Sequence, residues 1–222
     1  MQDIENTSGI TGCLSATIPF KYLGLPVGNN MNRSNNWEDI IQKVQKKLGT
    51  WKVKLLSIGG RLTLTKSVIG SHGTYFMSMF KMPETFNRRI EASRAQFFWG
   101  RDGTNKKKIS WVQWKKVLNS KEKGGLGIGS LKALNLALIQ KWRWRFHTDT
   151  KGIWKKIITS IYGPNGGFGN QGSTSKGNGL WSSIVKVIDQ MHGQHIVEYK
   201  NMRNQLGMVS TLDYGWIYGW VT

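Results

Sequence analysis

The sequence has 222 residues, of which 39% are hydrophobic, and it includes 11 Trp and 8 Phe. This is enough apolar material for a packed core, which excludes wholesale disorder. The 32 Lys and Arg residues against 12 Asp and Glu residues give a net charge of +20. The one cysteine, Cys13, excludes an intrachain disulfide and a cysteine-based zinc site.

The N-terminal part of the chain predicts a short strand followed by a helix. Residues 18–28 are apolar and aromatic and are interrupted by Pro and Gly, which favours a strand and a turn. A helix is expected from Asn36, which can cap it, and Asp39 lies near the positive end of that helix. The apolar residues of this helix recur at helical spacing: Trp37, Ile40, Ile41, Val44, Leu48 and Trp51.

The middle of the chain predicts two long helices. One follows Ser57 and continues to Phe80, because its apolar residues keep a helical period, although residues 61–65 alternate like a strand. Met82-Pro83 ends this helix and starts another, which ends at Gly100. The buried side of the second helix is expected to carry Phe86, Ile90, Ser93 and Phe97.

The C-terminal half predicts three more helices. After a stretch of loops and a short apolar segment (residues 101–125), Ser130 is expected to cap a long helix that reaches Phe146. A further helix covers residues 153–161, and a last helix follows the Gly/Asn/Ser linker of residues 163–179. We therefore expect a mainly α fold: a helical bundle with a short N-terminal strand or hairpin.

The acidic residues do not predict an active site. Two-metal phosphoryl chemistry needs two or three converging carboxylates, whereas the Asp and Glu residues are scattered. The one adjacent pair, Glu38-Asp39, is explained by the helix dipole. The glycine-rich run of residues 124–129 precedes a helix but follows a lysine-rich loop. It favours a turn, although its amides could touch a phosphate.

The charge is best explained by a polyanionic partner, with nucleic acid ahead of an anionic membrane and of an inherited charge that is no longer used. No apolar run approaches the roughly 18 residues that span a bilayer. The polar N-terminus is not typical of a signal peptide. We therefore expect no membrane partner and an intracellular location, with nucleus and cytoplasm both open.

Basic and aromatic residues interleave in a way that suits backbone tracking and base stacking. Trp144 is the best candidate for an exposed ring, whereas Trp51, Trp142 and Trp154 lie on apolar stripes. The residues expected to bind nucleic acid are Lys43, Lys46, Lys47, Lys52, Lys54, Arg61, Lys66, Lys106, Lys107, Lys108, Trp144 and Arg145.

Several segments resemble, in order, the LINE-type (non-long-terminal-repeat) reverse transcriptases that are abundant in plant genomes. The first is PFKYLGLPVG (19–28), and the likeness is dense over residues 18–163. The other segments are LLSIGGRLTLTKSVIGSHGTYFMSMFKMP (55–83), FFWG (97–100), ISWVQWKKV (109–117), KGGLGIGSLKALNLALIQKWRWR (123–145) and IWKKIITSIYG (153–163), followed by LWSSI (180–184), Trp216 and Trp220.

The resemblance implies a position within such an RNA-directed DNA polymerase. Residues 1–35 would join palm to thumb, residues 36–162 would form a thumb and connection that grip the template–primer duplex, and residues 163–179 would be a linker. Residues 180–222 would hold a terminal helix and a tail. The catalytic palm, with its Mg²⁺, would lie upstream, and a zinc-binding segment downstream. No cofactor is then expected in this chain.

The leading hypothesis is a non-catalytic remnant that binds nucleic acid, as RNA or an RNA–DNA duplex, without sequence specificity. A reverse transcriptase palm would be a second partner. The alternatives are the C-terminal part of an active reverse transcriptase in a longer reading frame, and a relic or interaction module with no nucleic-acid role.

Overall fold

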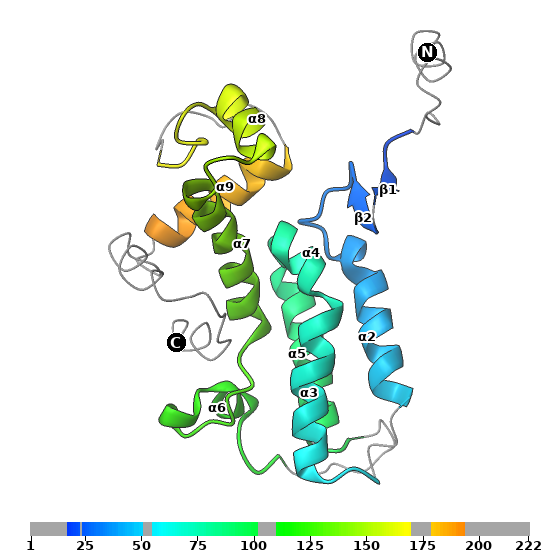
Figure 1. Cartoon of the computed structure of the whole chain (residues 1–222). Helices are drawn as coiled ribbons and strands as arrows, with labels where there is room; N and C mark the ends of the chain where they lie inside the picture. The colour runs from blue at the N-terminus through cyan, green and yellow to red at the C-terminus, as the bar shows by residue number, and fades with distance from the viewer. Residues whose placement is uncertain (1–16, 23, 51–54, 102–109, 170–178, 194–222) are drawn as a thin grey trace.

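The computed structural model describes residues 17–22, 24–50, 55–101, 110–169 and 179–193. The fold is mainly α-helical with a short antiparallel hairpin near the N-terminus (Figure 1), which confirms the predicted fold class. The elements are β1 (Phe20–Tyr22), β2 (Leu25–Val27), the 3₁₀ turn η1 (Ser34–Trp37), α2 (Glu38–Thr50), α3 (Ile58–His72), α4 (Thr74–Met79), α5 (Glu84–Phe98), α6 (Trp114–Leu118), the 3₁₀ turn η3 (Lys121–Lys123), α7 (Leu131–Thr148), α8 (Ile153–Tyr162) and α9 (Leu180–Gly193).

The hairpin pairs β1 with β2 in a tight antiparallel register, with Phe20 opposite Val27 and Tyr22 opposite Leu25. Gly24 lies in the turn with a φ of 82°, a conformation that glycine adopts without steric cost. The predicted strand and turn are therefore present. The following helix begins at Glu38, two residues later than predicted, because residues 34–37 form a 3₁₀ turn.

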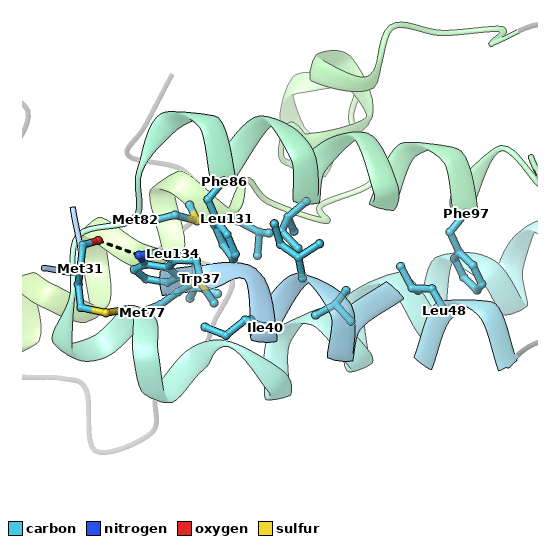
Figure 2. Packing of buried hydrophobic residues seen from close by; sticks show 13 residues of the cluster. Met31, Trp37, Ile40, Leu48, Met77, Met82, Phe86, Phe97, Leu131 and Leu134 are labelled. Carbon is cyan, nitrogen blue, oxygen red and sulfur yellow. Dashed lines mark hydrogen bonds between the residues drawn. The ribbon is translucent and has the colours of Figure 1, made fainter. Parts of the chain in front are cut away.

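The first hydrophobic cluster lies among α2, α3, α4, α5 and the start of α7. Trp37 is fully buried at its centre, and its indole Nε1 donates a 2.8 Å hydrogen bond to the Met31 carbonyl (Figure 2). The Trp37 ring lies 4.7 Å from that of Phe86 and 6.3 Å from that of Phe76, measured between centroids. This aromatic contact fixes η1, directly before α2, against α4 and α5.

The helix predicted after Ser57 is interrupted, so the prediction of one helix as far as Phe80 is wrong. Gly73 ends α3 and precedes the short helix α4. The carbonyl groups at the end of α4 find partners on α7: the Asn135 amide nitrogen donates to the Met77 and Phe80 carbonyls at 2.7 and 2.8 Å. These contacts fix the end of α4 to α7, because a helix end leaves carbonyls that need donors.

Helix α7 joins the first cluster to a second. Leu131 and Leu134 pack in the first, whereas Ile139 and Phe146, later in the same helix, pack in the second. The second cluster is completed by α8, by α9 and by Phe168, which lies in the turns after α8 and is only 4% exposed. Phe168 belongs to the segment that the sequence predicts as a linker, and the expected domain boundaries remain predictions.

The predicted helix starts at Ser57 and Ser130 are confirmed by their capping contacts. The Ser57 hydroxyl accepts a hydrogen bond from the Gly60 amide, and the Ser130 hydroxyl accepts one from the Ala133 amide, both at 3.1 Å. A side-chain oxygen in this position satisfies one of the amides that a helix leaves free at its first turn. Both helices therefore begin where a local signal places them.

Candidate nucleic-acid interface

Helix α2 presents three lysines to solvent. Lys43, Lys46 and Lys47 are exposed and lie within one turn of one another, so they share a face. Ile41 and Val44 occupy the buried side of the same helix. The structure thus assembles three of the predicted site residues into one basic strip, here named the α2 face.

The carboxylates at the start of α2 are paired with cations from other elements. Glu38 accepts two hydrogen bonds from the Arg89 guanidinium, at 2.7 and 2.9 Å, and Asp39 lies 3.2 Å from the Lys21 ammonium. The hydrogen bonds from Arg89 lower the pKa of Glu38, so this carboxylate is ionised and already compensated. Both carboxylates at the start of α2 are therefore compensated by cations outside the α2 face.

Lys66 lies in a different place, beside the glycine-rich turn. It is exposed one turn along α3 from Leu62, which packs in a third cluster with Phe98, Val117 and Ile128. Lys66 and Lys121 both lie next to Gly127. A Cβ placed on this glycine would be 4.0 Å from the Lys66 ammonium and 3.7 Å from Cγ of Lys121.

Two basic patches therefore form, and not one. Figure 1 shows α2 and α6 on opposite sides of the pair made by α3 and α5. The first patch is the α2 face. The name α6 patch is used for the exposed Lys66 and Lys121 beside Gly127, together with the exposed Lys115 and Lys116 of α6. Arg61 is half-buried on α3. Lys52, Lys54 and Lys106–Lys108 lie outside the described residues.

The glycine-rich turn is a closed structure, which argues against a phosphate cradle. The amides of residues 124–127 and 129 already donate to carbonyls of residues 117–121, at 2.8 to 3.1 Å. Gly124, Gly127 and Gly129 have φ between 62° and 75°, as such a turn requires. These five amides are used within the turn, and the exposed lysine side chains beside it are the groups that favour phosphate there.

A buried ion pair fixes the α6 patch to the bundle. Glu91 lies 2.9 Å from the Arg94 guanidinium, and their side chains are 13% and 3% exposed. The Glu91 carboxylate also accepts from the Trp114 indole at 2.8 Å and from the Leu131 amide at 2.9 Å. Arg94 donates to the Gly129 carbonyl at 3.2 Å. One carboxylate thus connects α5, α6 and the first turn of α7.

The sequence gives no local signal for this hub. Glu91 and Arg94 follow the three-residue spacing of many exposed helical pairs, and the prediction placed Ser93 on the buried side. Ser93 is half-buried, and Arg94 is the buried residue. Only the packing of α6 and Gly129 over this part of α5 explains why a charged residue is buried there.

The aromatic residues differ from the expectation in one respect. Trp144 is half-buried, whereas Trp111 is 84% exposed beside the α6 patch. Arg145 is exposed, but its guanidinium carbon lies 5.3 Å from the centre of the Trp142 ring, a cation–π contact within the chain. Trp111 is therefore the described tryptophan best placed to stack on a base.

Arg143 is part of the core and not of the surface. It is 2% exposed and contacts His192, and its guanidinium carbon lies 5.3 Å from the Phe168 ring centre. Burial lowers the pKa of Arg143, and Asp189 opposes that effect. The basic and aromatic run around Trp142 and Trp144 therefore divides between core and surface.

The described residues contain neither a three-residue metal-ligand group nor a membrane-spanning helix. Within these ranges, His, Cys, Asp and Glu do not gather in a group of three that could hold a metal ion. Among the helices that the structure describes, none combines the length and the apolarity needed to cross a membrane.

Two proteins of Arabidopsis thaliana are similar to this chain. One carries the provisional name of a ribonuclease H protein and is 33% identical over 138 residues, which are 62% of this chain and 22% of that protein. The chain thus spans about a fifth of the length of this relative. The other is an uncharacterized mitochondrial protein, 27% identical over 153 residues, which are 66% of this chain and 90% of that protein. No family model and no solved structure matches the chain.

Proposed function

We propose that this chain derives from a retroelement and forms the non-catalytic grip of an RNA-directed DNA polymerase. In this role it binds the backbone of RNA or of an RNA–DNA duplex without sequence specificity. The observation that carries the proposal is the α2 face, where Lys43, Lys46 and Lys47 are exposed on one side of the helix.

Charge of this kind favours phosphates over bases. Lysine is a point charge on a flexible stem, and it neutralises phosphate without reading the base edges. The net charge of +20 adds long-range attraction for any polyanion. The resemblance in sequence and the name of one relative, a ribonuclease, support a nucleic-acid role. Because the chain spans 22% of that relative, the grip belongs in this proposal to a longer protein.

The α6 patch supplies a second contact in the same proposal. Lys66 and Lys121 converge beside Gly127. Trp111 is exposed three residues before the start of α6. Stacking of a base on an exposed aromatic ring contributes about 1–3 kcal/mol and tolerates any sequence. The Glu91 hub holds α6 against α5 and α7, which reduces the backbone ordering needed on binding.

The test compares two variants with the same net charge. In the first, Lys43, Lys46 and Lys47 are each replaced by Gln. In the control, Lys151, Lys156 and Lys186, which are exposed on the side of α8 and α9, are replaced by Gln. Binding to a fluorescent RNA–DNA hybrid is measured by anisotropy at several salt concentrations.

Replacing the α2 face is expected to reduce the slope of log K against log salt concentration by up to about three, roughly one for each lysine that no longer neutralises a phosphate. The control variant is expected to keep the slope of the unchanged protein. Two hybrids of unrelated sequence are expected to bind equally. An equal reduction in both variants would show that only the overall charge matters, and absence of binding at low salt would refute the proposal.

A further inference from the structure

Helix α8 carries a row of exposed isoleucines that its own packing does not explain. Ile153, Ile157 and Ile161 are 75%, 53% and 58% exposed, and their four-residue spacing places them on one face. Trp154 and Ile158 point the other way, into the second cluster. Isolated exposed apolar residues are ordinary on a protein surface, but a contiguous row marks an interaction site.

An apolar groove lies beside this row. It encloses about 310 Å³, close to the lower limit for pockets that bind small molecules or side chains. Ile157 belongs to both the row and the groove, so the two form one surface, here named the α8 surface. The groove is lined by Met79, Trp142, Trp154, Ile157, Ile158, Leu180, Trp181 and Ile184, from four helices.

The rim of the α8 surface is cationic. Lys156 is exposed on α8 next to Ile157, and Lys151 is exposed just before the helix. The Lys155 ammonium lies 5.2 Å from the Phe146 ring centre, within the second cluster. The chemistry of this surface therefore selects an occupant that is apolar and aromatic, carries no cation, and has an acidic residue at its edge.

One segment of the chain itself has this composition. Residues 213–221 read DYGWIYGWV, with one acid, Asp213, and no Lys or Arg. The four aromatic residues, Tyr214, Trp216, Tyr218 and Trp220, alternate with small or aliphatic residues. In an extended chain this period of two places all four rings on the same side.

The length of the chain allows this contact. The groove includes Leu180 and Trp181 at the start of α9, and α9 is 14 residues long, or about 20 Å. Residues 194–212 follow α9 and reach at most about 60–70 Å when fully extended. The segment can therefore return along α9 to the groove.

We propose that residues 213–221 bind the α8 surface as an extended aromatic strip. The indole of Trp216 or Trp220 fills the groove, the other rings cover Ile153, Ile157 and Ile161, and Asp213 faces the Lys156 side. Covering the row in this way removes apolar surface from water, which favours the contact.

Disulfide trapping tests the proposal on the full-length chain. In a Cys13→Ser background, Ser160→Cys is combined with Gly219→Cys, because Ser160 is exposed on α8 beside the isoleucine row and is not part of it. The control pair combines Gly219→Cys with Gln96→Cys, an exposed position on α5. Mild oxidation is followed by peptide mapping with mass spectrometry.

The Ser160→Cys pair is expected to form an intramolecular disulfide about tenfold faster than the control pair, because docking raises the local concentration of the two thiols. Adding Ile157→Lys is expected to bring the rate down to that of the control, while circular dichroism stays unchanged because Ile157 is half-exposed. Equal rates for the two pairs would overturn the proposal. So would crosslinks formed mainly between chains, which would indicate a second copy as the occupant.

Discussion

Replacing Glu91 by Ala is expected to destabilise the protein severely. The change removes the acceptor of three donors: the Trp114 indole, the Leu131 amide and the Arg94 guanidinium. Because the Arg94 side chain is 3% exposed, its charge would stay buried without an acid beside it. Breaking a buried ion pair from one side costs about 3–5 kcal/mol.

The expected loss of stability can be compared with that from breaking an exposed ion pair in the same chain. Glu38 and Arg89 form a bidentate contact, but their side chains are 38% and 48% exposed. Solvent screens such pairs, so Glu38→Ala is expected to change the stability far less than Glu91→Ala. Glu91→Gln keeps an oxygen that can accept one hydrogen bond, and it is expected to fall between the two.

Urea unfolding followed by tryptophan fluorescence measures these differences. A destabilisation of about 3–5 kcal/mol corresponds to a decrease in Tm of roughly 6–20 °C for a chain of this size. Hydrogen exchange is expected to speed up most at the amides of residues 124–127 and 129, whose carbonyl partners lie in and beside α6. Equal destabilisation by Glu91→Ala and Glu38→Ala would refute the reasoning, since burial would then make no difference.

Two further predictions concern the glycine turn and acid stability. Gly125→Ala is expected to unfold the turn, because its Cβ would lie 2.1 Å from the Asn119 carbonyl oxygen. Gly124→Ala has open space around its Cβ and is expected to lower the free energy of unfolding by about 1–2 kcal/mol, because of its positive φ alone. Thermal melts of the two variants measure this difference. The Trp154 indole donates to Asp149 and lowers the pKa of that carboxyl below its ordinary 3.8. The stability from this contact is therefore complete above the unfolded pKa and is lost as the pH falls through the lowered folded pKa. Asp149→Asn is expected to reduce the stability at pH 7 and to flatten the decline of stability below about pH 4. Urea titrations at several pH values measure both effects. An unchanged decline would contradict the role of the Trp154–Asp149 contact in acid stability.

Local signals in the sequence predicted the helices well. Ser57 and Ser130 cap where they were expected, because a hydroxyl at the first turn acts within three residues. The break at Gly73 was not predicted, since the apolar period continues across it to Phe80. Asn135, which lies far along the chain, binds the carbonyls at the end of α4 and fixes that short helix to α7, a contact for which the sequence has no local signal.

The candidate site was harder to predict than the fold, for a similar reason. Composition locates basic residues along the chain, but packing decides which of them reach solvent. Arg94 and Arg143 are buried, whereas Lys43 and Lys66 are exposed on different patches. The exposed ring of Trp111 and the closed amides of the glycine turn also depend on how α6 folds back on α5. The residues expected to bind nucleic acid therefore remain predictions that the salt-dependence experiment addresses.

The position of α7 bears on how the chain could be divided. Its first half supplies Leu131 and Leu134 to one cluster, and its second half supplies Ile139 and Phe146 to the other. A cut on either side of α7 would separate one of the two clusters from the α7 side chains that pack in it. The two clusters should consequently melt as a single cooperative unit, and any shorter version of the protein that keeps both clusters has to keep the whole of α7.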